Sequence, residues 1–122
     1  AGPEISVAST KAYVAQCVLF TLLALYVAQV RETPGVRVRD WVRELRRLPA
    51  LAEEALLSEP EIERLAEETR DMPLAFFLGR GADAAIAYEA ALKLKEVAYV
   101  PTQEAPAGEM KHGPLALVEK GV

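Results

Sequence analysis

The sequence predicts an α/β protein that is mostly helical and contains about one clear strand. Three observations support this class. Residues 12–30 are uncharged and apolar over helical length, apolar residues recur at helical spacing after Val38, and residues 74–78 form a short continuous apolar run. Such a run, followed by a glycine turn and a long helical pattern, is typical of a buried strand in a parallel sheet.

The first predicted helix covers residues 12–30, where 19 residues pass without a charge. At 1.5 Å per residue this helix is roughly 28 Å long, which is close to the thickness of a membrane. Gln16, Thr21 and Gln29 interrupt the apolar stretch. We therefore expect a fully buried core helix or a dimer-interface helix rather than a membrane span. The hydroxyl of Ser9 or Thr10 is expected to cap its first turn.

A turn at residues 33–35 precedes a second, amphipathic helix. Its apolar side contains Val38, Trp41, Val42, Leu45 and Leu48, which recur at helical spacing. Its other faces carry Arg37, Arg39, Arg43, Arg46 and Arg47. A basic face could bind an anionic partner, but a solvated face is the more common explanation and is the one we favour.

The remaining elements are predicted from turn and capping signals. Ser58 and Glu61 form a possible capping box for a helix that ends near Asp71. After the strand at residues 74–78, a glycine turn leads into a helix over residues 84–99, which Asp83 is expected to cap. The residues that follow contain Pro101, Pro106 and Pro114 and are expected to form a loop.

Composition limits the function. Hydrophobic residues make up 52% of the chain and charged residues 26%, which indicates a globular protein of 122 residues, enough for one modest domain. The net charge of −4 argues against a nucleic-acid partner. Cys17 is the only cysteine, which fits a reducing cytoplasm, and we expect it to be buried. No cluster has metal-ligand spacing, and no cofactor is expected.

Lys93 and Glu96 are three residues apart on the last predicted helix, so they lie on one face with Cβ atoms about 5–6 Å apart. From spacing alone, an ordinary surface ion pair contributing at most about 1 kcal/mol is the better explanation. The only histidine, His112, follows within one short loop. A lysine, a carboxylate and an imidazole together could move protons on a sugar.

Three segments share a pattern with a known family: residues 4–13 (EISVASTKAY), 89–96 (EAALKLKE) and 108–114 (GEMKHGP). In this order they closely resemble the sugar isomerase (SIS) half of glucosamine-6-phosphate synthase, the glutamine–fructose-6-phosphate aminotransferase family. The resemblance implies part of a tandem SIS unit with flavodoxin-like parallel sheets. Residues 1–48 would end the first SIS domain, residues 49–73 would link the domains, and residues 74–122 would begin the second.

The same resemblance implies roles for individual residues. Glu96 would move the proton between neighbouring carbons of the sugar, and Lys93 would steady or relay charge on the sugar oxygen. His112 would open the sugar ring in the site of the neighbouring subunit. Val7, through its backbone, and Ser9, through its hydroxyl or backbone, would line the sugar pocket, although Ser9 is equally well explained as a helix cap. Glu89 and Lys95 look structural.

For the complete protein, the resemblance implies a cytoplasmic homodimer that makes glucosamine 6-phosphate from fructose 6-phosphate and glutamine. These 122 residues look cut at both ends and contain no match to the family's phosphate-binding loop, Schiff-base lysine or glutaminase domain, so we expect them to be inactive alone. The alternatives are a SIS enzyme without a glutaminase, such as a sugar-phosphate isomerase or an amino-sugar-phosphate deaminase, and a non-catalytic sugar-phosphate-binding module. A helical interaction fragment is a further possibility.

Overall fold

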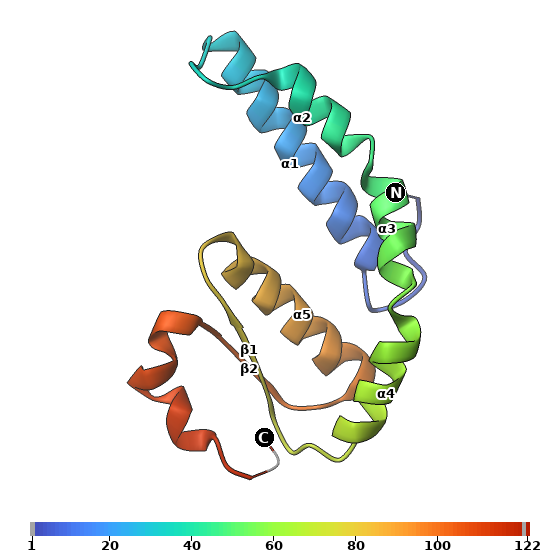
Figure 1. The fold of residues 1–122 in the computed structure, drawn as a ribbon, viewed down its shortest axis with the longest axis vertical. Helices are drawn as coiled ribbons and strands as arrows, with labels where there is room; N and C mark the ends of the chain where they lie inside the picture. The colour runs from blue at the N-terminus through green and yellow to red at the C-terminus, as the bar shows by residue number, and fades with distance from the viewer. Residues whose placement is uncertain (1, 121) are drawn as a thin grey trace. The chain divides into compact units, whose positions relative to one another are not determined.

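The computed structural model describes residues 2–120 and 122, and its chain divides into two compact units, residues 1–65 and 66–122. The first unit contains α1 (Thr10–Val30), α2 (Val38–Leu45), α3 (Leu48–Leu56) and most of α4 (Glu59–Thr69). The second contains β1 (Ala75–Gly79), α5 (Ala82–Ala98), β2 (Thr102–Pro106) and the 3₁₀ helices η1 (Ala107–His112) and η2 (Pro114–Leu117), as Figure 1 shows. The fold is therefore α/β and mostly helical, as predicted.

Helix α1 is apolar on every side, yet the described chain covers little of it. Leu25 is its one buried residue among those described, and Phe20 and Tyr26 are largely exposed. The expectation of a buried core helix is thus wrong within the described chain, where α2 covers part of α1 and leaves most of it exposed, and the alternative of a dimer-interface helix stays a prediction. Cys17 is exposed for the same reason, against prediction. By length and composition α1 could span a membrane, but a single such helix is weak evidence, since core helices meet the same criteria.

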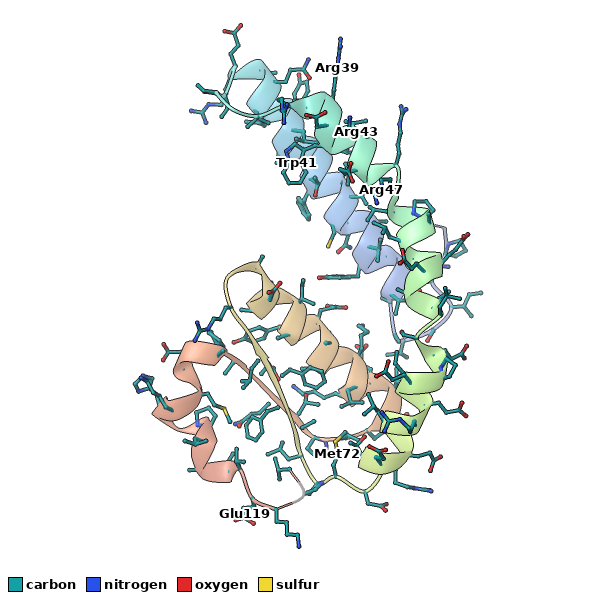
Figure 2. All side chains as sticks on the ribbon, viewed as in Figure 1. Arg39, Trp41, Arg43, Arg47, Met72 and Glu119 are labelled. Carbon is teal, nitrogen blue, oxygen red and sulfur yellow. The ribbon has the colours of Figure 1, made fainter. Side chains whose placement is uncertain are left out.

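The amphipathic pattern after Val38 forms two helices rather than one. Helix α2 ends at Leu45, and α3 starts at Leu48 with a proline in its first turn, a position where the missing N–H has no cost. The arginines of α2 project from the helix, as the labelled Arg39 and Arg43 do in Figure 2, and they are exposed. Asp40 pairs with Arg37 at 3.0 Å and with Arg43 at 3.3 Å, so the predicted solvated face is confirmed.

The core of the second unit is a β1–α5–β2 unit. The two strands are parallel, with a register that runs from Ala75 opposite Thr102 to Gly79 opposite Pro106. Helix α5 contacts both strands and buries Ala87 and Ala91. The predicted strand β1 is confirmed, but its side chains are only half-buried because two strands and one helix cannot enclose them.

Strand β2 was not predicted from the sequence. Its residues, Thr-Gln-Glu-Ala-Pro, are mostly polar and end in proline, so the pattern indicated a loop. The backbone nevertheless pairs with β1 along its whole length. Beyond β2 the chain turns directly into η1, which contacts both strands.

The turn between β1 and α5 depends on two glycines. A Cβ at Gly79 would lie 2.2 Å from the carbonyl oxygen of Asp83, so the first turn of α5 can approach β1 only because this side chain is absent. Gly81 occupies the N-cap position with φ +55°, a region that glycine enters at no steric cost. Asp83 lies inside the first turn and makes no capping hydrogen bond, so its predicted role as the cap is wrong.

Candidate active site

The candidate site is built around Lys93 on α5. Its ammonium donates a hydrogen bond to Glu96 at 2.7 Å and pairs with Glu89 at 3.5 Å. These contacts follow from helix geometry, because residues three and four positions apart lie on the same face. The side chains are well shielded, with 22% of Lys93 and 24% of each carboxylate exposed. The sequence predicted that Lys93 and Glu96 share a face but assigned Glu89 no part in this cluster.

The two carboxylates favour the protonated form of Lys93. The hydrogen bond to Glu96 raises the pKa of the Lys93 ammonium above its ordinary value of 10.5, burial opposes this, and the charges of Glu96 and Glu89 add to it. Lys93 is therefore a fixed positive charge at neutral pH. A fixed cation beside a carboxylate can stabilise negative charge that develops on a substrate oxygen.

His112 does not join this cluster within one chain. Helix α5 starts beside the carboxyl end of β1 and returns to the amino end of β2, so Glu96 lies toward the amino edge of the sheet. His112 ends η1, which follows the carboxyl end of β2 (Figure 1). From Asp83 to Glu96 the helix advances by about 20 Å along its axis. The histidine is exposed.

The other predicted site residues lie in the first unit, in the segment ahead of α1. Val7 is exposed and Ser9 is half-buried. Ser9 occupies the N-cap position of α1, but its side chain makes no capping hydrogen bond; its backbone carbonyl accepts from the N–H of Tyr13. The hydroxyl of Ser9 therefore does not cap α1.

The candidate residues line none of four hollows on the described surface. Two of the hollows lie along α2 and one lies beside residues 67–73, and Lys93, Glu96 and His112 line none of these. Among residues 2–120 and 122, no group of three or more histidine, cysteine or acidic side chains could hold a metal ion. The arrangement offers a carboxylate that can transfer a proton and a fixed cation, both partly buried on one face of α5.

Fold and site together define an α/β domain with a parallel sheet whose helix carries a paired lysine and glutamate. Residues 70–122 match the SIS domain family.

The chain as a whole is similar to a segment of one kind of SIS protein. It is 52% identical over 120 residues to the glutamine–fructose-6-phosphate aminotransferase (isomerizing) of Pseudomonas putida and 47% identical over 121 residues to that of Thermus thermophilus. Each match covers 98% of this chain and 20% of the relative, so the chain spans about a fifth of the length of these curated relatives.

A solved structure gives the same result. The C-terminal domain of glucosamine-fructose-6-phosphate aminotransferase from Francisella tularensis superposes with a TM-score of 0.91 and 41% sequence identity. The superposition covers 98% of this chain and 34% of that structure. The predicted resemblance to the isomerase half of these enzymes is therefore confirmed over nearly the whole chain.

Proposed function

We propose that this chain is the central part of the isomerase half of a glutamine–fructose-6-phosphate aminotransferase, which makes glucosamine 6-phosphate. The observation that carries the proposal is the shielded Lys93–Glu96 pair, with its 2.7 Å hydrogen bond, in a chain 41% identical to such an isomerase domain at a TM-score of 0.91. Residues 1–48 would end the first SIS domain and residues 74–122 would begin the second.

Glu96 is the proposed base. Interconversion of a ketose and an aldose requires one group that removes a proton from a carbon next to a carbonyl and returns it to the neighbouring carbon. A carboxylate on a rigid helix suits this task, because proton transfer requires a base held within about 3 Å of the proton. The hydrogen bond from Lys93 fixes the rotamer of Glu96 before substrate arrives.

Lys93 is the proposed electrostatic partner. Sequence alone left two roles open for it, steadying charge on the sugar oxygen and relaying a proton. Its raised pKa supports the first role, because an ammonium held by two carboxylates gives up its proton reluctantly. As a fixed cation, Lys93 would stabilise the enediolate oxygen that forms during the transfer.

His112 is proposed to open the sugar ring in the site of the neighbouring subunit of a homodimer. Its place beyond the carboxyl end of β2, whereas Glu96 lies toward the amino edge of the sheet, supports this assignment, because a single sugar would have to span the sheet to touch both groups of one protomer. Val7 and Ser9 are proposed to contact the sugar from the first SIS domain. The proposed location of the complete enzyme is the cytoplasm.

The first test is Glu96→Gln in the full-length protein. This change keeps the shape of the side chain and removes its basicity, so the turnover number for conversion of fructose 6-phosphate to glucose 6-phosphate should fall by about 10²–10⁴-fold. The Michaelis constant should change little. The control is Asp40→Asn on α2, which removes the ion pairs of Asp40 with Arg37 and Arg43 in the first unit and should leave turnover unchanged. Unaltered turnover in Glu96→Gln would contradict the assignment of the base.

A second test separates the alternatives. Product analysis with and without glutamine distinguishes an aminotransferase from an isomerase that lacks a glutaminase. A protein that binds fructose 6-phosphate but converts it under neither condition would support a non-catalytic binding module. Consumption of glucosamine 6-phosphate with release of ammonia would support a deaminase.

A further inference from the structure

The ion pair between Lys95 and Glu104 joins the two structural elements that carry the proposed catalytic groups. Lys95 lies between Lys93 and Glu96 in sequence but projects from another face of α5, toward the strands. Its ammonium contacts both carboxylate oxygens of Glu104, at 3.1 and 3.3 Å. Glu104 is the central residue of β2, opposite Phe77 of β1. This is a contact between elements, unlike the ion pair of Lys93 with Glu96, which lies within one helix.

A second hydrogen bond supports the same junction. The hydroxyl of Thr102, the first residue of β2, donates to the main-chain carbonyl of Ala91 at 3.2 Å. Ala91 is fully buried, so α5 lies close against the strands at this point. The two contacts are one helical turn apart on α5 and two residues apart on β2. Together they restrict both sliding and rotation of the helix on the sheet.

We infer that Lys95 and Glu104 are positioning residues that hold the proposed base, Glu96, and the proposed ring-opening group, His112, in a fixed relation across one protomer. The inference rests on the proposed function. Glu104 lies two residues before Pro106, where β2 ends and η1 leads to His112. A change in how α5 packs on β2 would therefore move two groups: Glu96 in the site of its own subunit, and His112 in the site of the neighbouring subunit.

Such positioning contacts matter because catalysis tolerates only small displacements of the catalytic groups. Catalytic groups must be held within roughly 0.5 Å of the productive position. A displacement of about 1 Å can lower turnover by roughly 10²-fold without loss of the fold. The Lys95–Glu104 pair is only partly exposed, at 40% and 25% of the two side chains, which limits its screening by solvent.

The first experiment uses Glu104→Gln and Lys95→Met in the full-length protein, with Asp40→Asn as the matched ion-pair control. We expect turnover for fructose 6-phosphate isomerisation to fall by about ten- to a hundredfold in both variants, with the Michaelis constant and thermal midpoint near those of the wild type. The exchanged pair, Lys95→Glu with Glu104→Lys, should recover part of the lost turnover. A merely structural pair would lower the thermal midpoint and leave turnover unchanged.

The second experiment uses mixed dimers. One subunit carries Glu96→Gln and the other His112→Ala, so the one complete site takes Glu96 from the second subunit and His112 from the first. Adding Glu104→Gln to the first subunit disturbs only the histidine of that site, and adding it to the second disturbs only the base. We expect activity to fall in both cases.

The outcomes distinguish the two proposals. Wild-type protein without isomerase activity would overturn the proposed function and, with it, this inference. Active wild type with unchanged turnover in Glu104→Gln, a loss not recovered by the exchanged pair, or a loss in only one of the two mixed dimers would overturn the inference alone. Should Lys95→Met fail to fold, Glu104→Gln and the exchanged pair still decide the question.

Discussion

Replacing Gly79 with alanine tests whether the first turn of α5 packs as closely against β1 as it does in the structure. The new Cβ would lie 2.2 Å from the carbonyl oxygen of Asp83, 2.3 Å from its carbonyl carbon and 2.5 Å from the nitrogen of Ala84. All three atoms belong to backbone, so no side chain can rotate away. The first turn of α5 must instead move outward by about 1 Å, since carbon and oxygen in contact prefer about 3.5 Å.

The expected cost is about 3 kcal/mol, the upper end of the range for overpacking, because backbone must shift. Since 1.4 kcal/mol is a factor of ten, local opening of α5 should become about 10²-fold more frequent. Hydrogen exchange of the α5 amides in the full-length protein measures this opening directly. Under the proposed function, isomerase turnover should fall as well, because Lys93 and Glu96 move with the helix.

Gly108→Ala is the matched control for exchange. A Cβ at Gly108 meets nothing within 4 Å, and its backbone does not require glycine, so the change should alter stability by less than about 0.5 kcal/mol. If α5 in Gly79→Ala exchanges at the wild-type rate, the close approach of helix and strand is wrong.

Three further predictions follow from single positions. Ala91→Leu adds three carbons at a position with no exposed surface and should destabilise by about 1–3 kcal/mol, which faster exchange in α5 would reveal. Tyr99→Gly should stabilise by up to about 1 kcal/mol, because Tyr99 has φ +57° and a side chain that is 88% exposed; a lower thermal midpoint would contradict this. The pKa of Lys93 is raised, so the stabilisation from its ion pairs is fully present below pH 10.5 and is lost only as the pH rises beyond that value. The pH–rate profile should therefore show no decline from Lys93 below about pH 9.5. Lys93→Met should lower turnover at every pH.

Local periodicity was sufficient for the longest elements. The uncharged stretch before Val30 and the apolar run after Pro73 were predicted as a helix and a strand, and both are confirmed. The pairing of Lys93 with Glu96 also followed from spacing, because helix geometry alone brings such residues together. These predictions depend on contacts between residues close in sequence.

Features that depend on tertiary pairing could not be predicted in this way. Strand β2 has a polar sequence and forms because β1 offers a parallel partner, which no local pattern indicates. Two predicted caps also failed: the hydroxyl of Ser9 makes no capping hydrogen bond to α1, and Gly81 takes the cap position expected for Asp83. The type of residue near a helix start was therefore not sufficient to predict which residue caps that helix.

The register of β1 and β2 also has a consequence for the order of assembly. Every pair in it joins residues 27 positions apart, and the connecting chain is the helix that packs on both strands. The Lys93–Glu96 pair lies within one helix and should form as α5 forms, whereas the parallel pairing of β1 with β2 joins residues far apart in sequence and should form later. Under the proposed function, His112 reaches a sugar only after two subunits meet. Refolded protein should therefore regain secondary structure at a rate independent of its concentration and regain activity later, at a rate that increases with concentration.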